Sequence, residues 1–181
     1  MDKNSQSASP EGIYEEGLSE FDKKGVIVSN ILMILWLIIG IYAVFLFSAA
    51  AGIIYGIIVA VLLLFVMRKA LCTKCFYYGK RCSMGWGLYT AKLFKKGNVS
   101  EFKGCKASKF APLMWMTFSF LPLVLIIVSA YLSFSVFKVI LAVILVIFII
   151  IIGSPKNRQR TCSLCKMRYL CAGSAAKDKK N

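Results

Sequence analysis

The 181-residue chain contains no histidine and only eight acidic residues. Beyond residue 22, the acidic residues are Glu101 and Asp178 alone. Catalytic triads of the serine–histidine–aspartate or cysteine–histidine type need an imidazole base, so the composition excludes them. Carboxylate-pair chemistry has no pair outside the N-terminal tail, and there is no glycine-rich phosphate loop. We expect no catalytic activity of the chain's own; any chemistry belongs to cysteines or to a metal that they hold.

Charge is also scarce, since charged residues make up 17% of the chain and hydrophobic residues 59%, with a mean hydropathy of +0.71. Two stretches of 43 residues each, 25–67 and 110–152, contain one charged side chain between them, Lys138. A helical span needs about 20 apolar residues, so each stretch accommodates two spans and a tight turn. This excludes a soluble enzyme and a secreted disulfide miniprotein. The sequence predicts an all-α integral membrane protein with four transmembrane helices, near residues 26–47, 52–68, 111–132 and 137–153.

The positive charges predict the orientation. Of the 23 Lys and Arg residues, eleven lie between the second and third spans, eight follow the fourth, three precede the first, and one is Lys138. Cytoplasmic loops retain Lys and Arg, so we expect a plasma-membrane protein with both termini cytoplasmic. The expected organisation is an acidic, disordered N-terminal tail (1–24), a first transmembrane hairpin (25–68), a cytoplasmic basic Cys-rich loop (69–109), a second hairpin (110–153) and a cytoplasmic basic Cys-rich tail (154–181).

The acidic N-terminal tail allows a second interpretation, because it could also dock on the basic loop or on a basic partner.

Each hairpin is followed by a similar cysteine cluster, which indicates an internal repeat. Two CxxC pairs begin at Cys72 and Cys162, 90 residues apart, and a third cysteine follows each pair. Because each half has an even number of spans, the halves share one orientation and form a pseudo-two-fold parallel repeat about an axis along the membrane normal. Both clusters would then emerge on the same side of the membrane.

All seven cysteines lie outside the predicted spans, which a packing role explains poorly. The cytoplasm is reducing, so CxxC there indicates a metal site or a redox dithiol. Neighbouring Lys and Arg residues favour the thiolate, which is the ligating form. Without histidine, such a site is rich in sulfur and suits Zn or an Fe-S cluster, which the sequence does not distinguish. The candidate metal ligands are Cys72, Cys75, Cys82, Cys105, Cys162, Cys165 and Cys171.

Three ways of sharing these ligands remain open. Cys105 could complete the first triad, giving a closed four-cysteine site and an open three-cysteine site. The two CxxC pairs could instead combine across the two-fold axis into one site. Alternatively, each triad could hold a cluster with one non-cysteine ligand.

The central loop contains a segment, residues 83–96, in which Trp86, Tyr89 and Leu93 fall near one side of a helix. Lysines lie on its flanks, as is typical of a helix in the membrane interface. The net charge of +15 lies beside the spans, where anionic headgroups of the lipid bilayer are the expected partner. There is no nucleic-acid-binding signature, and nucleic acid is not an expected partner. We expect a membrane-protein partner or a homo-oligomer.

These features favour an accessory or electron-transfer subunit of a membrane complex with a cytoplasmic Cys-ligated metal site. Two alternatives stay open: a scaffold or assembly factor with structural zinc, and a membrane thiol–disulfide redox protein. Metal content and a visible absorbance spectrum separate the three.

Overall fold

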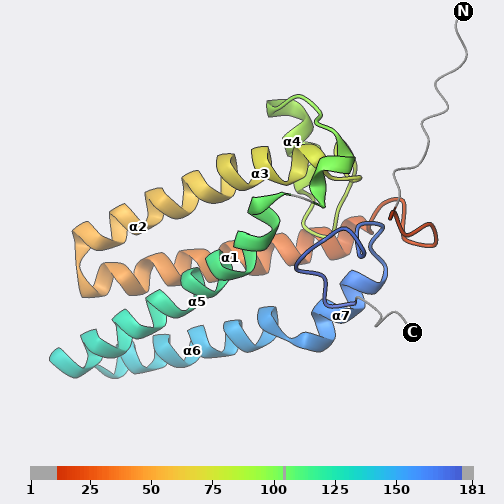
Figure 1. Cartoon of the computed structure of the whole chain (residues 1–181). Coiled ribbons are helices and arrows are strands. Elements are labelled where there is room, and N and C mark those ends of the chain that lie inside the picture. Colours follow the sequence, from red (N-terminus) through yellow and green to blue (C-terminus); the bar gives the residue numbers. More distant parts are fainter. Residues whose placement is uncertain (1–11, 104, 177–181) are drawn as a thin grey trace, which may run out of the picture.

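The structure is a computed structural model that describes residues 12–103 and 105–176. The described part is helical apart from loops and one isolated β-bridge. Figure 1 shows the long helices side by side, with the short helices and the loops gathered at one end of the bundle. The elements are α1 (Lys23–Phe47), α2 (Ala49–Val61), the π-helix Leu62–Val66, α3 (Met67–Ala70), the 3-10 helix Cys72–Lys74, α4 (Trp86–Leu93), the 3-10 helix Val99–Phe102, α5 (Lys106–Leu132), α6 (Val136–Gly153) and α7 (Pro155–Ser163).

Four helical segments of the described chain are long and apolar enough to cross a membrane, which confirms the prediction of a multi-pass membrane protein. They are Lys23–Phe47, Ala49–Lys74, Phe110–Leu132 and Val136–Ser163. Their outward faces carry Ile, Leu, Val and Phe side chains about half exposed, as contact with lipid requires. The specific membrane and the orientation of the chain in it remain predictions.

The break between the first two helices is shorter than predicted. The expected turn covered 48–52, but α2 already begins at Ala49, directly after Ser48. The Ser48 backbone N–H donates to the Val44 carbonyl at 3.0 Å, and its side chain accepts from the Ala51 N–H at 3.5 Å. Ser48 thus ends one helix and caps the next, and the alanines that follow are strong helix formers.

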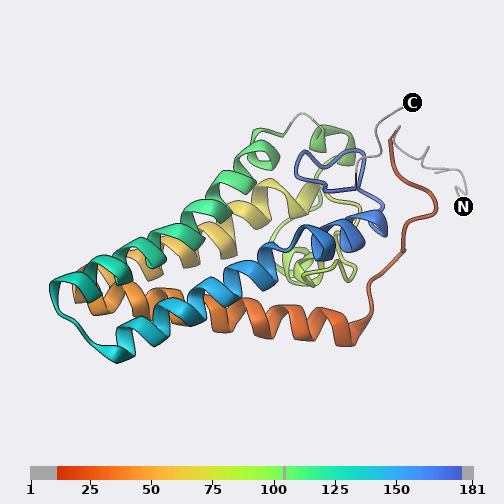
Figure 2. The ribbon, with the colours of Figure 1, turned by 90° about the horizontal axis from the view of Figure 1, so that it is seen from below.

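Helix α1 packs against α2, α5 and α6, and the long helices run side by side in both views (Figures 1 and 2). Trp36 on α1 stacks on Trp115 of α5, with ring centroids 5.6 Å apart. Gly52 of α2 lies so close to α1 that a Cβ there would be 2.6 Å from the Phe45 Cα. Gly56, one turn further on, also faces α1, so the small residues of α2 form a packing surface within the chain.

Helix α5 contains two prolines and starts earlier than predicted, since Lys106 rather than residue 111 begins it. Pro112 therefore lies inside this helix rather than in its first turn. Pro122 lacks an N–H, so the Phe118 carbonyl one turn earlier has no intrahelical donor. The Tyr55 hydroxyl of α2 supplies one, donating to the Phe118 oxygen at 3.0 Å.

The single charged residue of the second apolar stretch caps a helix end. The Lys138 ammonium of α6 donates to the carbonyls of Ser129 and Ser133, each at 3.1 Å, and to the Ser133 hydroxyl at 2.5 Å. These carbonyls belong to the C-terminal end of α5, where a cation is favoured. At the other end, α6 stops at Gly153, and α7 begins with Pro155 in its first position.

Candidate functional site in the cysteine-rich cap

The loops at one end of the bundle form a compact cap, which we define as residues 12–22, 71–103 and 155–176. Six of the seven cysteines lie in the cap, and Cys105 lies at its edge as the N-cap residue of α5. All seven are half-buried. The cysteines therefore gather on one side of the bundle, as the sequence predicted.

Tyr77 forms the centre of the cap and is only 2% exposed. Its hydroxyl donates to the Leu18 carbonyl at 2.7 Å and accepts from the Lys166 backbone N–H at 3.2 Å. One side chain thus joins the N-terminal tail, the central loop and the C-terminal tail. Around Tyr77 the core contains Phe102, Met167 and Leu170, and four cysteines pack against it: Cys75, Cys82, Cys165 and Cys171. No periodic signal in the sequence marked Tyr77, because it lies in a loop.

The two cysteine clusters approach one another in this core. Burial raises the pKa of Cys75 far above its usual range, and the thiols of Cys72 and Cys165 raise it further. Cys165 belongs to the second cluster and also contacts Tyr77. The structure therefore places one cysteine of each CxxC pair beside the same tyrosine.

Burial also sets the protonation state of these thiols. It raises the pKa of Cys72 to about 11, although Arg68 acts in the opposite direction. Burial likewise raises the pKa of Cys165 to about 11. The expectation that basic neighbours favour the thiolate is wrong for these residues, because desolvation outweighs the attraction of the surrounding cations.

Within residues 12–103 and 105–176, no three potential ligand side chains converge closely enough to hold a metal ion. The cap brings the two clusters together but does not preform a metal site.

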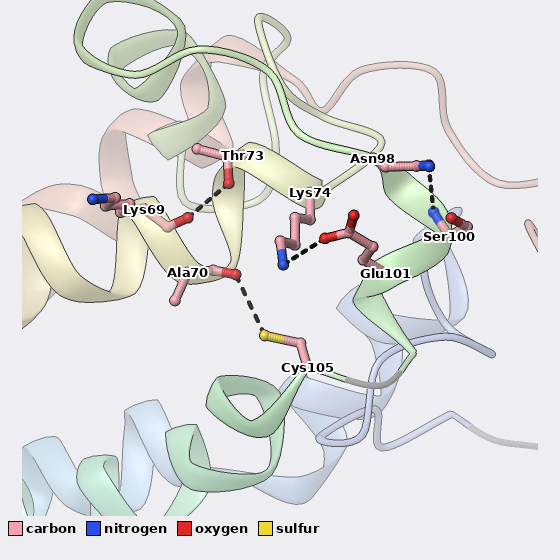
Figure 3. A network of polar contacts seen from close by, with 8 residues as sticks. All are labelled: Lys69, Ala70, Thr73, Lys74, Asn98, Ser100, Glu101 and Cys105. Atoms are coloured by element: carbon pink, nitrogen blue, oxygen red, sulfur yellow. Dashed lines mark hydrogen bonds and ion pairs between the residues drawn. The ribbon is translucent and has the colours of Figure 1, made fainter.

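Cys105 is engaged elsewhere. Its thiol donates to the Ala70 carbonyl at 3.4 Å, next to the ion pair between Lys74 and Glu101 at 2.7 Å (Figure 3). In the same network, the Thr73 hydroxyl donates to a carbonyl one helical turn earlier at 2.7 Å. These contacts tie the start of α5 to the end of the second span, and they give no support to Cys105 as the fourth ligand of the first triad.

The described part of the N-terminal tail, residues 12–22, lies across the cap. Leu18 forms a β-bridge with Cys165, and its N–H donates to the Leu164 carbonyl at 2.9 Å. Glu20 forms an ion pair with Arg81 at 2.5 Å. The opposite charges of tail and loop were the sequence signal for this docking. Residues 1–11 of the expected disordered tail lie outside the described residues.

The tail also packs through an aromatic contact. The Arg168 guanidinium lies over the Tyr14 ring, 4.2 Å from its centroid. Backbone bonds reinforce this contact, because the Tyr14 N–H donates to the Lys166 carbonyl at 2.9 Å.

A short helix, α4, forms within the segment predicted to be helical. Arg68, at the end of the second span, lies over the rings of Trp86 and Tyr89, at 5.4 and 5.6 Å. Tyr89 and Leu93 are more than half exposed, so α4 presents an apolar surface beside the membrane-spanning helices. Its location in the membrane interface remains a prediction.

No protein-family model, curated protein or solved structure matches this chain. The cap offers half-buried sulfur donors and peptide groups. Of its acidic side chains, Glu20 and Glu101 form ion pairs, Glu16 accepts from the Tyr14 hydroxyl, and Asp22 accepts from the Gly25 N–H. Such a set of groups suits binding of a soft metal better than acid–base catalysis.

Proposed function

We propose that this chain is a small subunit of a membrane complex whose cap binds a thiophilic metal through cysteines of both clusters. The observation that carries the proposal is the meeting of Cys75 and Cys165 beside Tyr77. Zn²⁺ and iron–sulfur clusters are the groups that sulfur-rich sites select. With iron–sulfur the subunit transfers electrons; with zinc the metal holds the two halves of a scaffold together.

The proposed ligands come from both CxxC pairs rather than from the first triad with Cys105. The Cys105 thiol bonds to a helix-end carbonyl, whereas the thiols near Cys75 are those of Cys72, Cys82 and Cys165. Rotation of half-buried side chains would bring further sulfurs onto the metal. The proposed set is therefore Cys72, Cys75, Cys162 and Cys165, with Cys82 and Cys171 adjoining it.

The arrangement of the helices supports the pseudo-two-fold repeat that this ligand set needs. Helices α1 and α5 contact each other at the centre, and each also packs against the helix that follows it. We propose that two hairpins, α1 with α2 and α5 with α6, are related in this way, and that the cap and both termini face the cytoplasm of the plasma membrane. The excess of Lys and Arg at the cap supports this orientation.

Elemental analysis with an absorbance spectrum tests the proposal, on full-length protein purified in detergent without oxygen or chelator. We expect metal in whole-number stoichiometry, and loss of it in the double variant Cys75→Ser/Cys165→Ser. The matched control is Cys105→Ser, which should retain the metal. Iron with acid-labile sulfide would indicate electron transfer, and colourless zinc would indicate a scaffold.

Two results would contradict the proposal. If the wild-type protein contained no metal, the remaining hypotheses would be a thiol–disulfide redox protein and a protein whose cysteines have no chemical role. Loss of metal in Cys105→Ser would place Cys105 among the ligands and refute the set chosen above.

A further inference from the structure

A cavity of about 180 Å³ lies where α5 meets the cap. Leu71 and Phe102 line it on the side of the central loop, and Arg158 of α7 lines it on the side of the C-terminal tail. The first three turns of α5 form its base, through residues spaced three and four apart: Ser108, Ala111, Pro112 and Trp115. The cavity thus lies between the two halves of the chain.

Two polar groups in this cavity are suited to an anion. Ser108 is only 4% exposed, and its hydroxyl has no hydrogen-bond partner within the described part of the chain. A buried hydroxyl without a partner is unfavourable, so binding of a ligand that accepts a hydrogen bond from it would be favoured. The Arg158 guanidinium donates to the Gly173 carbonyl at 3.0 Å and has further N–H groups to offer. None of the lining residues is acidic.

The depth of the cavity along the bundle corresponds to the headgroup layer of a bilayer. Ser108 precedes the membrane-length segment of α5, Phe110–Leu132, by two residues. Arg158 follows the end of α6, at Gly153, by five residues. The polar groups therefore lie just beyond the apolar part of two spans, where lipid phosphates are found.

We propose that this cavity binds the phosphate-bearing headgroup of an anionic membrane lipid. The Ser108 hydroxyl donates to one phosphate oxygen, and Arg158 forms a charge-assisted hydrogen bond with another. The N-terminal end of α5, a helix of 27 residues, adds a favourable dipole. Five of the nine lining residues are apolar, and Leu71, Phe102 and Trp115 would contact the glycerol and the first acyl carbons. These apolar walls favour a lipid over a free anion.

Native mass spectrometry of the full-length protein tests this assignment, with phosphatidylglycerol and phosphatidylcholine of the same chain length added in equal amounts. Wild type should retain phosphatidylglycerol preferentially. Arg158→Gln should weaken its binding about ten-fold, and Ser108→Ala about five-fold, as for loss of a charged and a neutral hydrogen bond. The matched control, Arg160→Gln, removes a charge from the same helix outside the cavity and should change retention less than two-fold.

Ser108→Ala removes a hydroxyl that makes no hydrogen bond within residues 12–103 and 105–176, so the variant should fold as the wild type does, which circular dichroism checks. Equal retention of the two lipids would overturn the proposal. So would equal losses in Arg158→Gln and Arg160→Gln. If inorganic phosphate alone displaced the lipid, the ligand of the cavity would be a soluble anion rather than a lipid, and the proposal would be overturned. The Ser108 and Arg158 variants leave all seven cysteines in place, so metal content measured on the same samples distinguishes failure of this proposal from failure of the proposed metal site.

Discussion

The hydroxyl of Tyr55 should stabilise the bundle because it serves a carbonyl that a proline leaves without a donor. Pro122 interrupts the hydrogen-bond ladder of α5, and Tyr55 donates to the Phe118 oxygen at 3.0 Å. Tyr55 is 8% exposed, so no water replaces the bond. Tyr55→Phe keeps the ring, which meets the Phe118 ring edge-on with centroids 6.2 Å apart, and removes only the hydroxyl.

The expected cost follows from the type of bond. A neutral hydrogen bond contributes about 0.5–1.5 kcal/mol, and interhelical bonds measured in membranes average about 0.6 kcal/mol with a maximum of about 1.7. We expect Tyr55→Phe to lower the free energy of unfolding by about 1 kcal/mol, because the Phe118 carbonyl that loses its donor has no other donor within the helix. This corresponds to about a five-fold smaller folding equilibrium constant. In a Pro122→Ala background the alanine N–H can serve Phe118 instead, so the same substitution should cost about 0.3 kcal/mol or less.

Unfolding in mixed detergent micelles, followed by tryptophan fluorescence, measures all four proteins of this double-mutant cycle. The control is Tyr42→Phe, which removes a hydroxyl from a ring 43% exposed at the bundle surface and should be near neutral. An equal cost of Tyr55→Phe in both backgrounds would refute the role of the proline. A cost for Tyr42→Phe as large as that for Tyr55→Phe would refute the role of the buried bond.

Two further predictions concern packing and pH. Gly52→Ala should destabilise the bundle by about 1–3 kcal/mol, because its Cβ would lie 2.6 Å from a backbone atom of α1. The control is Gly56→Ala, whose Cβ would meet ordinary contacts at 3.5 Å, so this variant should be neutral or mildly stabilising. Equal effects of the two substitutions in the same unfolding assay would contradict this prediction. In metal-free protein, Cys165 titrates at about 11 when folded against 9.0 ordinarily, so its contribution to stability is complete below about pH 9 and is lost as pH rises towards 11. Thermal melts should fall more steeply over this range in wild type than in Cys165→Ala, and parallel slopes would show that the burial of this thiol is unimportant.

The four spans could be predicted from sequence because lipid leaves a strong compositional signal. Any charge within 25–67 would be costly in hydrocarbon, and none is present. The helix boundaries were harder to predict. Residues 106–109 are polar in part, yet they extend α5 beyond the membrane, since helix formation there depends on local propensity and packing rather than hydropathy.

The cap could be predicted only in its composition. The matched cysteine clusters indicated that the two halves meet, and the structure places Cys75 and Cys165 together. The contacts that bring them together are aromatic and backbone contacts in loops, such as the Tyr77 hydroxyl with Leu18 and Lys166. Loops have no periodicity, so neither the role of Tyr77 nor the cavity beside Ser108 had a sequence signal.

The geometry of the cap couples its cysteines to the N-terminal tail. Leu18 bridges Cys165 directly, and its carbonyl accepts the hydroxyl of Tyr77, against which Cys75 packs. A metal bound as proposed to Cys75 and Cys165 would therefore act on two residues that contact the tail. Cys165 contacts Leu18 directly, and Cys75 contacts it through Tyr77. That tail leads into α1, which packs against α2, α5 and α6, so a metal bound as proposed would be joined through residues 12–22 to the bundle.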